Sequence, residues 1–586
     1  MLRSFLKNRL GKWSNRQNNA ASKRVLRVER LENRELLAAD PTVWALADYA
    51  GYSDYVIEGV DGTTPAPDQI VLYGIDSAGT KTELTHLDVE ADSALKIVAT
   101  GSSAETLTIE SSATKIGEIE FDGGSEDAVD VTIKGTAAVD TFAVSTDSSG
   151  ENVADTAADS GRHGRWDRWD DWGWGWHSRK DSKKDKVEKS SDDITLATLK
   201  VGEAETAFTV KGAASVTLDG DGGADVYKIT SVADDVVLVS DGTASVDFSD
   251  ADTGTAQNDR SHRWDDWGWD CWYCGWHSHG CEDSKIDGVT VDFGSSDFQT
   301  VSNYWNGRIK LDGTFNAVVG SAKSDKITGS NLKVTETAGK NVVTLTGGDN
   351  EVDLKSDGNS VSVEGAGTNS ITVSGNKSKI DLSKTTSAAA NTVSVSGDRN
   401  EAVGGEGADV FVVSGSDNTA KGGAGNDAIW AVAATGWGSY SGGDGDDLIF
   451  GGSGDDWIFG GDGRDIIFGS LGRDELDGGR GQDLIYANRG DLASDLESWD
   501  AAKRDAYFAS LQEAWIDDAD VDATVALIGS DQSDGARDKV YSDRGGEDRV
   551  FISDRDRNER GRSWDWWFEV RSRPPRAGFV LPLQLG

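Results

Sequence analysis

A nine-residue motif repeats five times without insertion over residues 442–486. Its form is Gly-Gly-x-Gly-x-Asp-x-U-x, where U is a large aliphatic residue. The five units have the sequences GGDGDDLIF, GGSGDDWIF, GGDGRDIIF, GSLGRDELD and GGRGQDLIY. A period this short cannot hold a helical repeat, but it suits one turn followed by one short strand. Paired glycines permit positive φ angles and a close approach of neighbouring backbones. The motif therefore predicts stacked coils of two units each, in which alternate units lie on the same side.

The spacing of stacked strands favours calcium between the coils. Neighbouring strands lie about 4.8 Å apart, so a cation midway between two layers would be roughly 2.4 Å from each. This distance falls in the range of about 2.3–2.6 Å for calcium–oxygen bonds and is too long for magnesium. The alternative is a glycine-rich solenoid without metal.

The five units resemble the hemolysin-type, or repeats-in-toxin (RTX), calcium-binding family, whose fold is a parallel β-roll. The resemblance implies that the aspartate at position six of each unit binds calcium between same-side turns, helped by carbonyl groups of the glycine-rich turn. The position-six residues are Asp447, Asp456, Asp465, Asp474 and Asp483, and the turn glycines are Gly445, Gly454 and Gly463. Same-side pairing gives candidate sites between Asp447 and Asp465, Asp456 and Asp474, and Asp465 and Asp483. The fourth unit has Ser470 in place of its second glycine, which weakens the site built on Asp474.

Two further units precede the tandem block, GGEGADVFV from residue 404 and GGAGNDAIW from residue 422. Their starts are eighteen residues apart, one full coil, so Asp409 and Asp427 are expected to face each other. The segment between them, VSGSDNTAK, lacks the paired glycines and suits a strand rather than a site. Asp225 and Asp325 follow similar but degenerate turns. Each is expected to stand alone, and a single turn cannot complete a metal cage.

Composition agrees with a calcium-binding β protein and argues against several other classes. The 586 residues include 102 Asp and Glu against 58 Lys and Arg, a net charge of −44, so the chain repels itself unless cations neutralise it. The acidic excess argues against nucleic acid as a partner, because nucleic-acid binders need a basic stripe. The sequence contains no apolar run long enough to predict a transmembrane segment. Its three cysteines do not make a disulfide framework.

The predicted fold class is all-β: a parallel β-roll or β-solenoid with irregular β domains upstream and a short helical C-terminal cap. Short alternating strands predict the β structure. Apolar residues at helical spacing over 492–515 predict a helix that closes the open end of the roll. The expected order is a basic N-terminal targeting segment (1–40), a β-rich region (41–160), a Trp-rich insert (161–191), a β-rich region (192–259), a Trp/Cys/His insert (260–285), an irregular β-solenoid (286–403), the calcium-binding β-roll (404–490), and a helical cap with a degenerate repeat tail (491–586).

The basic N-terminal segment is the basis for predicting export. It lacks the apolar core of an ordinary signal peptide. Its sequence LENRELLA over residues 31–38 resembles the Leu-Glu-Pro-Arg-x-Leu-Leu motif at the N-termini of planctomycete surface proteins, with Asn33 where that motif has proline. The resemblance implies an extracellular or cell-surface location, which also suits calcium-binding repeats. The alternative is a short amphipathic helix packed on the first β domain.

The two inserts share the sequence RWDDWGW and the ending GWHS. The second insert contains the soft ligands Cys271, Cys274, His277, His279 and Cys281, a set suited to zinc or copper. A Cys271–Cys274 disulfide and an unpaired low-complexity loop are the alternatives. The tryptophans could form a platform for glycans or interfacial lipid, because exposed aromatic residues mark binding surfaces. A mobile loop without a partner is the competing interpretation.

The sequence favours a binding protein over an enzyme. It contains neither the His-Glu-x-x-His motif of a zinc protease nor the Gly-x-Ser-x-Gly motif of a lipase. His86 is the only histidine outside the inserts. We expect an extracellular calcium-binding repeat protein whose β-roll folds on calcium, with a structural or adhesive role at the cell surface. Its partners would be calcium ions, with surface glycans or matrix as further candidates. A secreted hydrolase with a calcium-binding repeat tail is the alternative.

Overall fold

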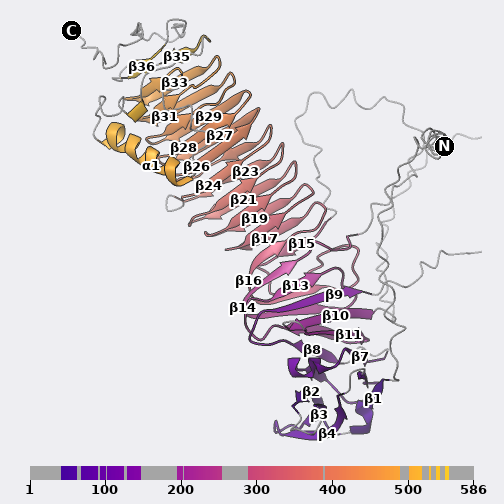
Figure 1. The fold of residues 1–586 in the computed structure, drawn as a ribbon. Helices are drawn as coiled ribbons and strands as arrows, with labels where there is room; N and C mark the ends of the chain where they lie inside the picture. The colour runs from indigo at the N-terminus through magenta and orange to yellow at the C-terminus, as the bar shows by residue number, and fades with distance from the viewer. Residues whose placement is uncertain are drawn as a thin grey trace, which may run out of the picture.

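The computed structural model describes residues 41–49, 51–61, 68–89, 93–100, 102–124, 129–146, 194–201, 204–253, 288–386, 390–488, 501–517, 527–528, 536–541 and 548–552. The strands stack into one elongated solenoid, with the N-terminal strands at one end and the C-terminal strands at the other (Figure 1). The predicted all-β fold with a parallel solenoid and a short helix near the C-terminus is confirmed. The N-terminal segment 1–40 and both inserts lie outside the described residues.

The N-terminal end of the solenoid is an antiparallel unit. In it, β2 (Asp54–Val60) pairs with β3 (Gln69–Ile75), and β3 pairs with β4 (Lys81–Asp88). Two parallel rows begin at the same end of the molecule, β1–β5–β7–β11 and β2–β6–β8–β12. Their bounds are β1 Thr42–Ala45, β5 Ala94–Val98, β6 Thr106–Ile109, β7 Glu118–Asp122, β8 Asp130–Lys134, β11 Ala204–Lys211 and β12 Ser215–Asp219.

Strand pairing continues past both inserts, which fall between β9 and β10 and between β14 and β15 along the chain. β10 (Ile194–Val201) pairs antiparallel with β9 (Asp140–Thr146) and with β11. The long strand β14 (Val236–Asp247) stacks on β12 with its first half and on β13 (Val226–Ile229) with its second half. β16 (Ile309–Val319) then pairs in parallel with both halves of β14. One hydrogen-bonded stack therefore joins the upstream region to the rest of the molecule.

From β15 onward the chain alternates between two parallel sheets. The even-numbered strands from β16 to β36 stack in the first sheet, and the odd-numbered strands from β15 to β35 form the second. The bounds are β15 Thr290–Asp292, β17 Lys326–Ser330, β18 Lys333–Glu336, β19 Val342–Thr346, β20 Glu351–Leu354, β21 Ser360–Gly365, β22 Ser370–Val373, β23 Lys379–Thr385, β24 Thr392–Val395, β25 Glu401–Val403, β26 Val410–Gly415, β27 Asn418–Ala424, β28 Ala428–Ala434, β29 Gly438–Asp444, β30 Leu448–Phe450, β31 Trp457–Gly463, β32 Ile466–Phe468, β33 Glu475–Gly481, β34 Leu484–Tyr486, β35 Lys539–Tyr541 and β36 Arg549–Phe551.

The register of these strands sets the size of the coil. Ile449 pairs with Ile467, eighteen residues later, so two nine-residue units make one coil as predicted. The same spacing holds upstream of the repeats, where Val343 pairs with Val361. Some coils are longer, and Ser370 pairs with Thr392, twenty-two residues away. The extra residues lie in the connections, so the stacking of the strands is preserved.

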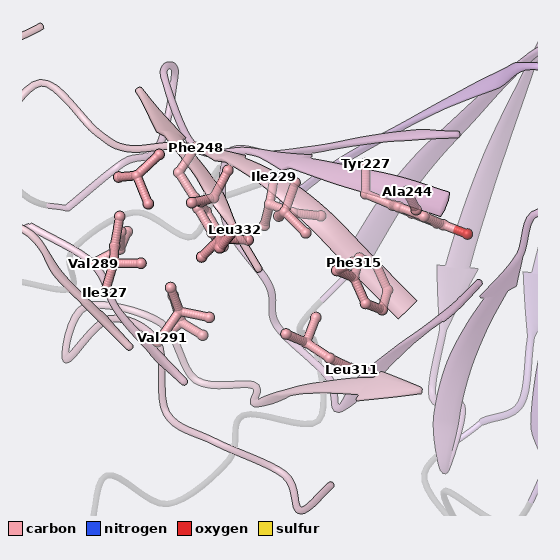
Figure 2. Close-up of a cluster of buried hydrophobic side chains, with 14 of the residues drawn as sticks. Tyr227, Ile229, Ala244, Phe248, Val289, Val291, Leu311, Phe315, Ile327 and Leu332 are labelled. Atoms are coloured by element: carbon pink, nitrogen blue, oxygen red, sulfur yellow. The ribbon is translucent and has the colours of Figure 1, made fainter. Parts of the chain in front are cut away.

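Alternating residues of each strand fill a continuous core between the sheets. Ile449, Ile467 and Ile485 are fully buried there and lie one above another in successive coils. Figure 2 shows this core where the upstream stack meets the two-sheet part, with Tyr227 and Phe315 on one side of the cluster and Val289 and Ile327 on the other. Because strand residues alternate between faces, in-register stacking of the coils places an inward-facing residue of each strand over an inward-facing residue of the next.

The C-terminal helix covers the outer face of the first sheet. The α-helix α1 (Ala501–Leu511) continues into a π-helical turn (Gln512–Asp517), and Leu511 and Trp515 pack with outward-facing residues of β28, β30, β32 and β34. The expected helix is therefore present, but it lies along the side of the roll rather than across its open end (Figure 1). The helix lies there because the repeat strands β30, β32 and β34 carry apolar side chains on their outer face as well as on their inner face. With the helix in place, all three residues of each of these strands are buried.

The open end is occupied by one more coil. After the helix the chain returns to the stack, where β35 pairs in parallel with β33 and β36 pairs in parallel with β34. Glu475 pairs with Lys539 and Leu484 pairs with Arg549, across the whole helical segment. What the sequence shows as degenerate turns is thus a continuation of the roll.

Candidate metal centre

The position-six aspartates form two rows of buried carboxylates along the roll. Each lies in the turn just before its strand, and all are at most 2% exposed. In the first row the backbone amide of each aspartate donates to Oδ1 of the next: Asp409 to Asp427 at 2.7 Å, Asp427 to Asp447 at 2.8 Å, Asp447 to Asp465 at 2.9 Å and Asp465 to Asp483 at 3.0 Å. In the second row Asp456 donates to Asp474 at 2.8 Å. The predicted same-side aspartates are therefore neighbours.

In three residues of the first row, Asp427, Asp447 and Asp465, one carboxylate oxygen accepts the ladder bond and the other has no donor. Oδ2 of Asp427, Asp447 and Asp465 and Oδ1 of Asp456 are buried without a hydrogen-bond partner. Such a group is costly unless a proton or a cation balances it. Burial is the main cause that raises the pKa of these carboxyls, to about 8 for Asp427 and Asp447, about 7 for Asp456 and about 9 for Asp465. The neighbouring Asp447 carboxylate raises the pKa of Asp465 further.

The glycines of each unit make room for these oxygens. A Cβ on Gly442 or Gly460, at position one, would collide with Oδ2 of the aspartate five residues later. The position-four residues Gly445 and Gly463 have φ of +131° and +153°, and a Cβ on either would collide with the carbonyl oxygen of the equivalent glycine in the coil before. A Cβ on Gly454 would likewise meet the carbonyl oxygen of Gly436. The turn backbones of successive coils therefore stack closely, with carbonyl oxygens directed at the glycines of the next coil.

These residues fit a calcium ion. Carboxylate and carbonyl oxygens are the ligands calcium prefers, and its coordination tolerates irregular geometry. No three His, Cys, Asp or Glu side chains converge on one point in the described parts of the chain, so each interlayer position would need backbone carbonyls as well. The residues that would hold the ion are the same-side aspartates and the stacked turn glycines. A bound divalent cation would neutralise the unpartnered oxygens.

Two of the predicted residues differ from the others in their surroundings. Asp409 accepts hydrogen bonds from Gly405 N at 2.8 Å and from N and Nδ2 of Asn391 at 2.9 and 2.8 Å, so it terminates the row rather than sharing its pattern. The fourth unit keeps its turn although it lacks the second glycine, because Ser470 adopts a φ of +79°. Asp474 is consequently in register with Asp456.

The coils before the roll carry asparagine at the equivalent places. Oδ1 of Asn369 accepts the side-chain amide of Asn350, and Oδ1 of Asn391 accepts that of Asn369, both at 2.8 Å. On the other side of the coil the backbone amide of Asn341 donates to Asn359 at 2.9 Å, and that of Asn400 donates to Asn418 at 2.8 Å. A neutral amide both donates and accepts, so the row of Asn350, Asn369 and Asn391 bonds from coil to coil without a cation. The change from asparagine to aspartate marks the start of the candidate centre.

Sequence reasoning missed several members of these rows. Asp474 N donates to Oδ1 of Asp538 at 2.9 Å and Asp483 N donates to Oδ1 of Asp548 at 3.1 Å, so both rows extend into the last coil. The signal was present, since each residue directly precedes a short strand, as the repeat aspartates do. Asp225 is also not alone, because Asp140 N donates to its Oδ1 at 2.9 Å from the neighbouring coil. Cys271, Cys274, His277, His279 and Cys281, proposed as transition-metal ligands, lie outside the described residues.

Fold and site together define a parallel β-solenoid with buried carboxylate ladders. A family model described as the RTX calcium-binding nonapeptide repeat matches residues 403–432, 441–476 and 459–491. These segments coincide with the aspartate coils, so the calcium-binding repeats are shown there, and the chain contains a calcium-binding β-roll. Among curated proteins none matches the chain significantly. In the described part of the chain, no helix has the length and apolar character to cross a membrane.

Proposed function

We propose that the chain is an extracellular calcium-binding protein in which the roll at 404–490 folds when calcium binds, and that it has a structural or adhesive role at the cell surface. One observation carries the proposal. Oδ2 of Asp427, Asp447 and Asp465 is buried without a donor, whereas upstream Asn350 and Asn369 each donate their side-chain amide to the next asparagine of the row. Because the ion would bind only the folded coil, its binding energy contributes to folding.

Calcium-dependent folding of the roll suits an exported protein. Extracellular calcium modules bind at about 10⁻⁴–10⁻³ M, so such a roll would stay expanded at cytosolic calcium and close outside the cell. The LENRELLA segment supports export by its resemblance to a surface-protein motif. An exposed aromatic pair on β31, Trp457 and Phe459, supports an adhesive face on the second sheet. The glycan or matrix partner is part of this proposal.

We favour binding over catalysis because the centre consists of carboxylates and backbone carbonyls held in the ladders. Small-angle scattering of the full chain tests the proposal. The radius of gyration should fall when calcium is added to chelated protein, and magnesium at the same concentration should not reproduce the change. An equal radius in calcium and in chelator would contradict calcium-dependent folding. Labelling of intact cells with an impermeant reagent tests the surface location separately.

A further inference from the structure

A second carboxylate pair lies well upstream of the roll, at the first coils of the two-sheet solenoid. Val319 pairs with Thr335, so Glu336 at the end of β18 stacks directly over Gly320 in the coil before. The Glu336 side chain is fully buried, and Oε1 and Oε2 have no hydrogen-bond partner apart from the neighbouring carboxyl of Asp325. A Cβ on Gly320 would collide with the Glu336 carboxylate. The carboxylate therefore projects into the turn that begins at residue 320.

Asp325 lies in that same turn, just before β17, and is also fully buried. Its Oδ1 accepts hydrogen bonds from Ser321 Oγ and from Val289 N, both at 2.6 Å, and its Oδ2 accepts one from Ser321 N at 2.9 Å. These bonds fix the carboxylate in one orientation. Its own backbone amide donates to Oδ1 of Asn341 at 2.9 Å, which makes Asp325 the first member of the asparagine ladder on that side.

The two carboxyl groups are both buried and interact with each other. Burial is the main cause that raises the pKa of Glu336 strongly, and the negative charge of Asp325 adds to it. Burial also raises the pKa of Asp325. The nearby Lys323 donates from Nζ to the backbone oxygen of Thr253 at 3.1 Å. Two unneutralised carboxylates are costly in such surroundings, so the pair must share a proton or hold a cation.

We propose that Asp325 and Glu336 bind a divalent cation of the calcium type, at a site separate from the repeats. Three features favour a cation over a shared proton. The candidate ligands are all oxygen, including Ser321 Oγ next to Asp325, and their two negative charges balance one divalent ion. Both oxygens of Glu336 are available, which suits the bidentate carboxylate binding that calcium uses and magnesium seldom does. Gly320 leaves space where any other residue would block the carboxylate.

The site has a structural consequence for the solenoid. Asp325 joins the turn before β17 to β15 through the amide of Val289, and Glu336 belongs to the next coil. A cation between them would clamp the first coils of the second sheet, next to the junction shown in Figure 2. The roll's calcium sites would then not be the only ions that stabilise this molecule.

The number of bound calcium ions in the full-length chain tests the proposal. Equilibrium dialysis at saturating calcium with excess magnesium should show one ion fewer in Glu336→Gln than in the wild type. Glu351→Gln is the matched control, because it removes one carboxylate from the adjacent coil, where the side chain is exposed and bridges to Lys333 at 2.8 Å. It should bind the wild-type number.

Asp325→Asn keeps the ladder acceptor and should lose the same ion, which covers the case in which Glu336→Gln fails to fold. Hydrogen exchange over residues 320–346 should then rise in calcium for both variants and stay unchanged for the control. Wild-type ion counts in both folded variants would show that the pair shares a proton and would overturn the proposal. The outcome is separable from calcium-dependent folding of the roll, because Asp465→Asn affects the roll and leaves this pair intact.

Discussion

The backbone amide of Asp447 donates a 2.9 Å hydrogen bond to Oδ1 of Asp465, its same-side neighbour in the next coil. The same Asp465 leaves Oδ2 buried without a donor. One oxygen therefore fixes the register of the coils, and the other faces the space between them. This division of labour gives different expectations for substitutions that remove the charge, the ladder bond or the space.

Asp465→Asn should act in opposite directions with and without calcium. It keeps the ladder acceptor but removes the charge, so calcium affinity should fall by about tenfold or more, since affinity follows the number of charged ligands. In chelator the same variant should favour the folded roll relative to the wild type, because the wild type can fold there only if the buried Asp465 carboxylate takes up a proton or stays unpaired. Calorimetric titration measures the affinity, and hydrogen exchange of the roll in chelator measures the second effect.

Asp446→Asn is the control for this variant. Asp446 occupies the variable fifth position, and its Oδ1 accepts the amide of Arg464 at 2.8 Å, a bond that asparagine can keep. Asp446→Asn removes one negative charge, as Asp465→Asn does, but the Asp446 side chain is only partly buried. Calcium affinity should change little. Equal losses in the two variants would mean that the position-six assignment is wrong.

Asn369→Asp is the reciprocal change in the asparagine ladder. Asn369 Nδ2 donates to Asn391 at 2.8 Å, and its Oδ1 accepts from Asn350 at 2.8 Å. A carboxylate would lose the donor and face an oxygen, at a cost of about 1–3 kcal/mol in urea unfolding. Ser370→Asp adds the same charge at an exposed position of the same coil and should cost less than about 0.5 kcal/mol. Similar costs for the two would argue against a ladder.

Gly460→Ala tests the space beside the carboxylate. The added Cβ would collide with Oδ2 of Asp465 and with the carbonyl of Gly478, so stability in saturating calcium should fall by about 1–3 kcal/mol. Gly117→Ala is the control, because a Cβ there meets nothing within 4 Å. If the two variants unfold at the same urea concentration, the absence of a side chain at Gly460 is not needed to make room for the Asp465 carboxylate.

Phe468→Ala should destabilise the covered face of the roll. Phe468 stacks on Phe450 with ring centres 4.2 Å apart and on Tyr486 at 5.2 Å, beneath the C-terminal helix. Its removal should cost about 3–5 kcal/mol in calcium. Phe459→Ala removes the same side chain from the exposed face of the second sheet, where the loss should be under about 0.5 kcal/mol. A small loss at Phe468 would show that the helix does not seal this face.

The sequence was sufficient for the local design of the roll. The nine-residue period predicted the coil, and the glycine positions predicted the turns in which Asp447 and Asp465 become neighbours. The position of the helix was harder to predict. The units LIF, IIF and LIY are apolar at all three strand positions, but so is WIF, whose Trp457 and Phe459 are exposed on the second sheet. An apolar triplet therefore does not show which face the helix covers.

Long-range pairing was beyond a sequence argument. Glu475 and Lys539 are paired although a helical segment without the nine-residue period lies between them in sequence. No local sequence feature indicates that the two strands are neighbours. The same holds for Asp140 and Asp225, which lie on either side of an insert. Glu336 was missed because it occupies the place of a position-one glycine, and only the register of β16 and β18 brings it over Gly320.

Hydrogen exchange of the full chain, followed by mass spectrometry in calcium, in magnesium and in chelator, tests the central claim most directly. The asparagine coils at 350–386 serve as an internal reference. We expect residues 404–488 to be protected in calcium and to exchange rapidly in magnesium or chelator, while the reference coils stay protected in all three. Equal protection of 404–488 in chelator and in calcium would contradict calcium-dependent folding of the roll.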